Sequence, residues 1–247
     1  MGAPPETQGL AGGSYVYDLS SATPSVPVAT LNNPSHALDD NFGYSVAISG
    51  TQIVVGALYD DTGATNTGIA YRYDISSPTP TAPTTNLYSF DLREIGAFGT
   101  TAVISGTRVV VGTYGDSGDS VGKVYAYDQS SATPLVPVEL NGYFWGENFG
   151  RSLAISGSRL VVGATAGFGG PGHAYVYDLN SATPSVPVIT LTSNNPDFGY
   201  SVAISGTRVV IGNYGSVSNG GGNAFVYDLV SATPTVPVST LNNPTGQ

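Results

Sequence analysis

The residues that could carry chemistry in this chain are aspartates in glycine-rich stretches and aromatic rings close to polar residues. Asp60 and Asp61 are adjacent, and Asp116 and Asp119 are three apart. Carboxylate oxygens are the ligands that calcium prefers. Neither pair has the spacing of a recognised calcium loop, and solvated turns explain both more simply. We therefore expect no cofactor, with calcium as an alternative at these four aspartates.

Three consecutive aromatic residues, Tyr143, Phe144 and Trp145, are the main candidates for ligand binding, and Trp145 is the sole tryptophan. Exposed aromatic rings beside Asp or Asn suit stacking on sugar rings or anchoring a protein partner. The alternative is that the three rings pack down onto the protein. The lesser candidates of the same kind are Tyr59, Tyr114, Phe168 and Tyr214.

Residues for catalysis are not evident, so we expect no enzyme and assign no catalytic residue. Serine is abundant, but no Gly-x-Ser-x-Gly motif joins a strand to a helix. A carboxylate pair for glycoside hydrolysis could be drawn only arbitrarily from the aspartates above. His36 and His173 are expected in loops without a second His or Cys nearby, which argues against zinc. The lack of cysteine excludes disulfides and thiolate sites.

Charge limits the partners of the chain. It has 247 residues, 17 of them acidic and 7 basic, and a formal net charge of −10. No basic patch can form to neutralise phosphates, so we expect binding neither to nucleic acid nor to anionic membranes. No stretch is long and apolar enough to be inserted in a membrane. The first residues lack the basic and apolar regions of a signal peptide.

The elements that must position these residues belong to a repeat of roughly 50 residues. Each unit contains Phe-Gly, an Ile-Ser-Gly turn, a β-branched run ending in Gly, and Tyr-x-Tyr-Asp. This period is typical of propeller blades rather than helical solenoids. The Phe-Gly pairs begin at Phe42, Phe98, Phe149 and Phe198, and the Tyr-x-Tyr-Asp motifs (one with Phe first) end at Asp18, Asp74, Asp128, Asp178 and Asp228.

Each unit is predicted to form four antiparallel strands. In the first complete unit these are residues 44–48, 52–57 and 69–74 and the stretch after Pro80. The short Ser-Gly-Thr connection predicts a tight hairpin with Gly at positive φ. Gly and Pro are frequent and helical periodicity is missing, so no substantial helix is expected. The predicted fold class is all-β: a β-propeller of four-stranded antiparallel blades.

The repeat also predicts the domain organisation. We expect one propeller domain over residues 1–247, with about five blade positions, four complete and one partial. The partial blade leaves an unpaired strand edge, so we expect closure into a tight ring or self-association through that edge. The partial blade is predicted at 1–34 and the complete blades at 42–88, 98–140, 149–192 and 198–244.

Phe-Gly followed by a strand and by Val-Val-Gly-Ala, as at 54–57, resembles the FG-GAP repeat of integrin α-subunit propellers and bacterial surface proteins. The resemblance covers essentially the whole chain. It implies an extracellular or cell-surface β-propeller that binds proteins or glycans. Many members carry a calcium loop between the first two strands of a blade. All four complete units have only the short Ser-Gly turn there, for example at 49–52, so the usual ligands are missing.

Residues shared by every unit are more typical of the scaffold than of a site. Each Asp after Tyr-x-Tyr is therefore predicted to form an Asx turn. Phe-Gly is predicted to supply a core ring and a close backbone approach, and the repeated tyrosines to be packed rings with solvated hydroxyls.

Residues that differ between units gather in the loops after the second strand and in the connections between blades, which share one end of a blade. On that face we expect a protein or carbohydrate ligand. The predicted function is a non-enzymatic extracellular binding or adhesion module of a larger secreted or surface protein. The alternatives are a passive structural spacer and a glycan-active enzyme.

Overall fold

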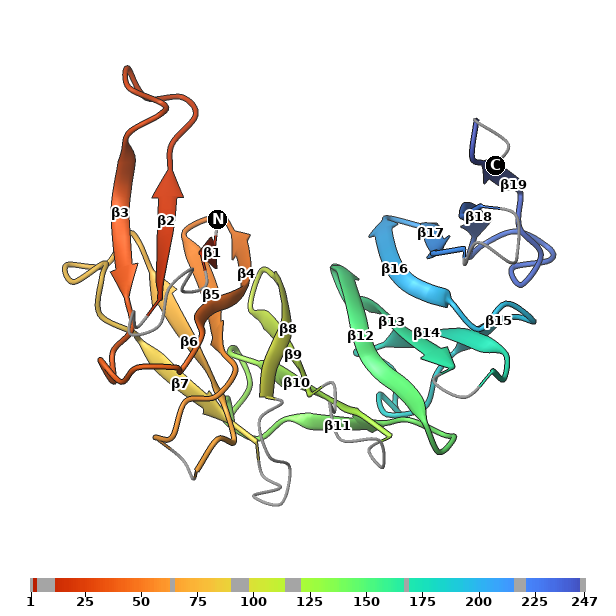
Figure 1. Cartoon of the computed structure of the whole chain (residues 1–247), viewed down its shortest axis with the longest axis horizontal. Coiled ribbons are helices and arrows are strands. Elements are labelled where there is room, and N and C mark those ends of the chain that lie inside the picture. Colours follow the sequence, from red (N-terminus) through yellow and green to blue (C-terminus); the bar gives the residue numbers. More distant parts are fainter. Residues whose placement is uncertain are drawn as a thin grey trace. The chain divides into compact units, whose positions relative to one another are not determined.

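The computed structural model describes residues 2–3, 12–62, 65–89, 98–113, 121–166, 169–215 and 221–244 (Figure 1). Within these ranges the regular elements are β-strands, and no helix there could cross a membrane. The chain divides into two compact units. The first contains Met1–Asp116 and Tyr127–Pro137, and the second contains Ser117–Ala126 and Val138–Gln247.

The described strands form five sheets, and in each sheet the strands follow one another in sequence order. The first sheet has three strands and the other four have four strands each. This confirms the prediction of an all-β chain built from four-stranded antiparallel blades. The first two sheets contain β1 (Gly2–Ala3), β2 (Gly13–Tyr17) and β3 (Pro27–Asn32), then β4 (Phe42–Ser49), β5 (Gln52–Ala57), β6 (Ile69–Asp74) and β7 (Thr85–Tyr88).

The other three sheets repeat this pattern along the chain. The third contains β8 (Phe98–Ser105), β9 (Arg108–Thr113), β10 (Lys123–Asp128) and β11 (Val138–Asn141). The fourth contains β12 (Glu147–Ser156), β13 (Arg159–Ala166), β14 (Gly172–Asp178) and β15 (Ile189–Ser193). The fifth contains β16 (Phe198–Ser205), β17 (Arg208–Asn213), β18 (Asn223–Asp228) and β19 (Ser239–Asn242).

The first strand of a blade starts earlier than the sequence suggested. β4 begins at Phe42 rather than at residue 44, because Gly43 adopts φ +93° and the register shifts between Phe42 and Ser45. This β-bulge lets the Phe side chain enter the core while the strand continues. At the other end of β4, Gly50 opens a two-residue hairpin at φ +61°, as expected for a type II′ turn.

The repeated glycines and serines hold neighbouring blades together. A Cβ at Gly199 would overlap the carbonyl oxygen of His173 in the preceding blade, so the two backbones touch. The Ser152 hydroxyl of that blade donates to the carbonyl of Gly199 at 2.8 Å. Ser45 and Gly99 form the same bond at 2.7 Å in the first unit. The predicted close backbone approach at Phe-Gly is confirmed.

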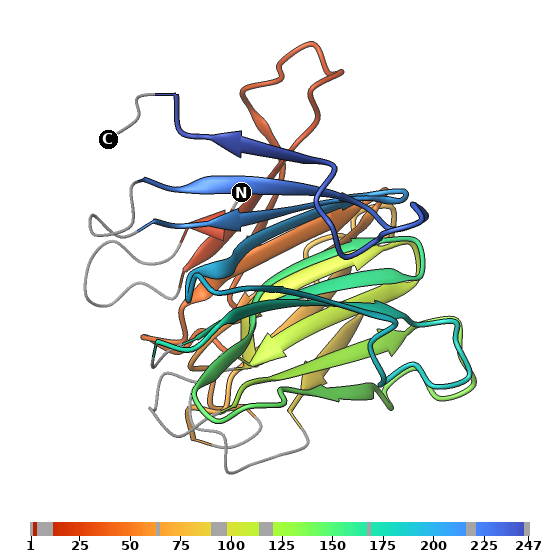
Figure 2. The same cartoon turned by 90° about the vertical axis from the view of Figure 1, so that its right-hand side faces the viewer.

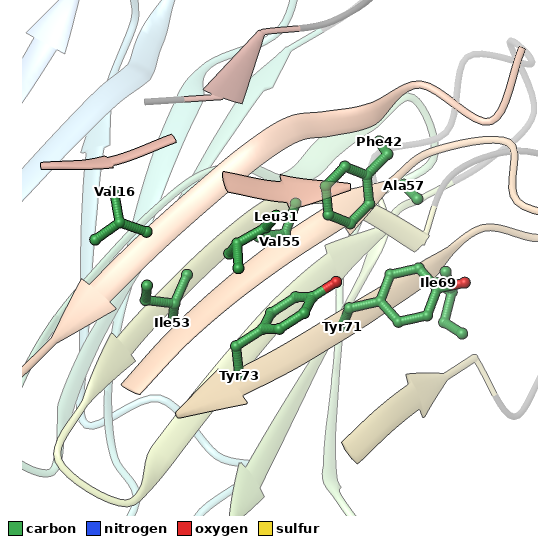
Figure 3. Packing of buried hydrophobic residues seen from close by; sticks show 9 residues of the cluster. All are labelled: Val16, Leu31, Phe42, Ile53, Val55, Ala57, Ile69, Tyr71 and Tyr73. Carbon is green, nitrogen blue, oxygen red and sulfur yellow. The ribbon is translucent and has the colours of Figure 1, made fainter. Parts of the chain in front are cut away.

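The core of the first unit packs the three-stranded sheet against the next blade. Val16 and Leu31, from β2 and β3, join one buried cluster with Phe42, Tyr71 and Tyr73 (Figure 3). The Phe42 ring lies 5.9 Å from the Tyr71 ring and 6.5 Å from the Tyr73 ring, centre to centre. Edge-on and tilted ring packing of this kind adds to the burial of apolar area. Phe42 and its three counterparts, Phe98, Phe149 and Phe198, are all completely buried.

Two of the repeated tyrosines, Tyr71 and Tyr73, differ from expectation at their hydroxyls, which are not solvated. The Tyr71 hydroxyl donates to the buried carboxylate of Asp60 at 2.6 Å. The Tyr73 hydroxyl is buried and has no hydrogen-bond partner among the described residues. Burial raises the pKa of both phenols. The prediction failed for Tyr71 because Asp60, in the loop between β5 and β6, lies within hydrogen-bond distance of its hydroxyl and is itself buried.

The aspartates that end each Tyr-x-Tyr-Asp motif form the predicted Asx turns. Oδ1 of Asp18 accepts from the backbone N–H and the hydroxyl of Ser20 at 2.8 and 2.6 Å, and these bonds lower the pKa of Asp18. The carboxylates are thus occupied in turn formation at the strand end. Four other Asx turns have the same i to i+2 backbone bond, at Asp74, Asp128, Asp178 and Asp228.

Candidate functional site

The turn between β11 and β12 exposes the three consecutive aromatic side chains that the sequence singled out. Tyr143 is 52% exposed, Phe144 57% and Trp145 66%. Two of the rings also contact side chains of β14, since Tyr143 lies 5.2 Å from Tyr175 and Phe144 lies 5.3 Å from His173, centre to centre. Each of the three side chains still has more than half of its surface exposed to solvent. We call these three residues the aromatic turn.

A buried carboxylate fixes the aromatic turn. Glu147, only 3% exposed, accepts the backbone N–H groups of Tyr143 and Phe144 through Oε2 at 2.8 and 3.1 Å. Its Oε1 accepts from the hydroxyl of Tyr175 at 2.6 Å. Hydrogen bonds to an ionised acceptor are stronger than neutral ones, so this carboxylate holds the backbone of the turn against β14.

His173 extends the ring system below the turn. Its ring stacks on Phe144 at 5.3 Å and on Tyr175 at 5.7 Å, with interplanar angles of 20° and 18°. Its Nδ1 lies 3.5 Å from Oε1 of Glu147. Burial lowers the pKa of His173 and outweighs the opposite effect of the Glu147 charge, so the neutral imidazole is favoured. The prediction that His173 lies in a loop is wrong, because β14 begins at Gly172.

Two pockets adjoin these rings, and Phe144 and His173 line both. One has a volume of about 310 Å³ and is also lined by Trp145, Glu147 and Pro171. The other has a volume of about 390 Å³, and its further lining residues are Tyr143, Tyr175, Val186, Pro187, Thr190 and Thr192. Volumes at the lower end of the range for ligand pockets suit a single ring or side chain. The rings can stack on such a group, whereas both oxygens of Glu147 are already engaged.

Two of the acidic candidates, Asp60 and Asp61, belong to the first compact unit, whereas the aromatic turn belongs to the second. Asp60 is completely buried and accepts from Tyr71 and from the backbone N–H of Thr62 at 2.8 Å. Asp61 accepts the backbone N–H of Asn66 at 2.6 Å. In the part of the chain that the structure describes, no group of three or more His, Asp and Glu side chains could hold a metal ion. Asp116 and Asp119 lie outside the described residues.

The lesser aromatic candidates are placed separately. Tyr59 follows β5 in the first unit, and its backbone N–H donates to the carbonyl of Asp40 at 3.1 Å. Tyr214 follows β17 in the second unit and stacks on Tyr200 at 5.0 Å, beside a different pocket from that of Trp145. Tyr114 and Phe168 lie outside the described residues.

Sequence reasoning missed Glu147, His173 and Tyr175 as partners of the aromatic turn. One pattern could have found His173, because the residue after Gly in the third strand differs in every complete blade. It is Ile69, Lys123 and Asn223 in the others. Glu147 stands two residues before Phe149, as Asp40 stands before Phe42, and both acids are buried.

The fold is similar to that of a solved structure. A europium-containing methanol dehydrogenase superposes with a TM-score of 0.53 and 12% sequence identity, over 79% of this chain and 40% of that chain. That protein is a β-propeller, and the likeness concerns the fold alone. The present chain is therefore a protein of the β-propeller class, and it spans 40% of the length of the structure it matches.

The repeats identify the kind of propeller. Residues 28–73, 145–177 and 192–227 match the family model of the FG-GAP repeat. The chain thus contains FG-GAP repeats in three regions of a β-propeller fold, as the Phe-Gly and Val-Val-Gly-Ala motifs implied. No curated protein sequence matches it.

Proposed function

We propose that this FG-GAP propeller is a non-enzymatic binding or adhesion module of a larger secreted or cell-surface protein. It would hold a protein or glycan ligand on the loops that differ between blades. The observation that carries the proposal is the aromatic turn, three adjoining rings exposed to solvent above the buried carboxylate of Glu147. Neither nucleic acid nor a membrane surface suits a chain with a net charge of −10.

Rigid exposed rings favour binding because little conformational freedom is lost when a ligand docks. The backbone of the turn is held by two hydrogen bonds to Glu147, and Phe144 is stacked on His173 before any ligand arrives. Aromatic residues of this kind are typical anchors of protein and sugar ligands. Contiguous exposed apolar rings also often mark an interaction site on a protein surface.

The non-enzymatic part of the proposal is supported by how the carboxylates are used. Asp60 and Glu147 are buried, and each accepts a tyrosine hydroxyl and backbone N–H groups. A general acid or nucleophile needs access to substrate, which these acids lack. The extracellular or surface location is supported by the FG-GAP repeats and the acidic charge.

The proposal is tested by screening the purified chain against an array of glycans and against immobilised extracellular-matrix proteins. A ligand should change the fluorescence of Trp145, and Trp145→Ala should abolish its binding. Leu135→Ala is the matched control, since it removes another exposed apolar side chain, 52% exposed against 66% for Trp145, from a turn that repeats along the chain. If no probe binds, the passive-spacer alternative is favoured. If both variants bind a ligand equally well, the aromatic turn is not its binding site.

A further inference from the structure

Three asparagines form a row across one end of the fifth sheet. Asn213 ends β17, Asn223 begins β18 and Asn242 ends β19. Asn213 pairs with Asn223, and Asn223 pairs with Asn242, so the three are cross-strand neighbours on the blue sheet of Figures 1 and 2. Directly paired residues of antiparallel strands point to the same face. The three amides, here called the asparagine row, therefore share one side of the sheet.

The same row is filled differently in other blades, so it does not belong to the common scaffold. In the second sheet the aligned residues are Ala57, Ile69 and Tyr88. In the fourth sheet they are Ala164, His173 and Thr192. Three amides in register therefore distinguish the fifth sheet from these two blades, as His173 distinguishes the fourth.

One side chain of the asparagine row, that of Asn213, is buried, and its carbonyl oxygen accepts no hydrogen bond from the described residues. Asn213 is 8% exposed, and its Nδ2 donates to Oδ1 of Asn223 at 3.1 Å. Its own Oδ1 is buried and has no hydrogen-bond partner among the described residues. An unpaired buried carbonyl is costly and uncommon in native structures. A donor supplied from outside the chain would remove this cost.

Asn213 lines a pocket with an aromatic wall. The pocket has a volume of about 410 Å³ and is lined by Tyr200, Ser201, Asn213, Tyr214, Asn223 and Asn242 among others. Tyr214 stacks on Tyr200 at an interplanar angle of 24°, and the guanidinium of Arg151 lies 4.2 Å from the centre of the Tyr200 ring. Tyr214 is held by this stack yet is 64% exposed, so most of its ring surface is open to a ligand.

We infer that this pocket binds a pyranose sugar, with an apolar C–H face on Tyr214 and a hydroxyl that donates to Oδ1 of Asn213. Amide and hydroxyl groups both donate and accept, which matches a ligand whose hydroxyls do the same. A purely apolar ligand would leave the Asn213 acceptor unpaired, and an anionic ligand could not donate to it. A cationic side chain could donate, but it offers no acceptor to Ser201 and the amide N–H groups.

This site extends the proposed binding function and is separate from the aromatic turn. It is tested with the full chain by saturation-transfer NMR against glucose, galactose, mannose and N-acetylglucosamine at millimolar concentration. At least one sugar should receive saturation from the protein. Asn213→Ala and Tyr214→Ala should each weaken that sugar by about tenfold or more. Trp145→Ala should leave its affinity unchanged.

The variants also separate failure of this site from failure of the proposed function. Asn213→Ala removes both the unpaired acceptor and the hydrogen bond to Asn223, so its thermal unfolding midpoint should stay close to that of wild type, and any loss of binding then reflects the site. Binding of no sugar by wild type overturns the inference, as does sugar binding by Asn213→Ala and Tyr214→Ala that is as tight as that of wild type. Sugar binding lost only in Trp145→Ala would support the aromatic turn and refute the asparagine row.

Discussion

Replacing Gly199 by alanine should destabilise the second compact unit far more than the same replacement at Gly206. Both glycines have positive φ, +92° and +58°, so either alanine costs about 1–2 kcal/mol for the backbone conformation alone. The Cβ at Gly206 would meet no heavy atom within 4 Å. The Cβ at Gly199 would overlap the carbonyl oxygen of His173 and lie 3.0 Å from the backbone nitrogen of Ala164.

Relief of that overlap requires the two blades to separate, which also weakens the bond from Ser152 to the Gly199 carbonyl. We therefore expect Gly199→Ala to lower the free energy of unfolding by about 4 kcal/mol or more, the range reserved for severe core damage. Gly206→Ala should lower it by about 1–2 kcal/mol. Urea unfolding followed by far-ultraviolet circular dichroism and by Trp145 fluorescence measures both values.

A third variant separates the steric overlap of the added Cβ from the cost of a positive φ. Gly163 does not have positive φ, but a Cβ there would overlap the carbonyl oxygen of Gly199 from the opposite side. Gly163→Ala should therefore resemble Gly199→Ala rather than Gly206→Ala. Equal unfolding free energies for all three variants would show that the blades can part freely at this contact, and the reasoning would be refuted.

Further predictions concern buried polar groups and the aromatic turn. Tyr71→Phe should cost about 1–3 kcal/mol in urea unfolding, because Asp60 loses a donor, whereas Tyr73→Phe should be nearly neutral; the reverse order would contradict this. Burial lowers the pKa of His173 below 6.5, so the unfolded state binds its proton first. The free energy of unfolding should therefore fall as pH drops below that value, and less so in His173→Gln. Acrylamide should quench native Trp145 readily, and a shielded response would refute its exposure.

Much of the fold could be predicted because each structural need recurs in every unit. Phe42 and its counterparts are buried, Gly50 opens a tight hairpin, and Asp18 forms an Asx turn, as expected from the repeats. The strand start at Phe42 was missed because a bulge at Gly43 breaks simple alternation. Bulges depend on cross-strand register, which a single sequence does not display.

Only the residues of the candidate site that are adjacent in sequence could be predicted. Tyr143, Phe144 and Trp145 are adjacent in sequence, so their clustering needed no fold. Glu147 and Tyr175 are 28 residues apart, and their hydrogen bond exists only once β12 and β14 share a blade. The asparagine row likewise needs the register of three strands.

The hydrogen bond from a serine hydroxyl to the Gly carbonyl of the next Phe-Gly, here called the joint between blades, also bears on how such a chain can lengthen by duplication. Each complete unit begins with Phe-Gly, and the Gly carbonyl accepts the serine hydroxyl of the preceding unit at Gly99 and Gly199. Three of the four complete units also carry a serine three residues after the Phe, whereas the unit that begins at Phe98 has Thr101 there. A duplicated unit thus arrives with both halves of the joint, and needs no compensating substitution to fit its neighbours. The segments 42–50 and 198–206 still share the same nine residues, Phe-Gly-Tyr-Ser-Val-Ala-Ile-Ser-Gly. Selection can then act independently on the loops of each copy. One gene duplication therefore supplies both an intact blade and a new set of loops whose residues can diverge.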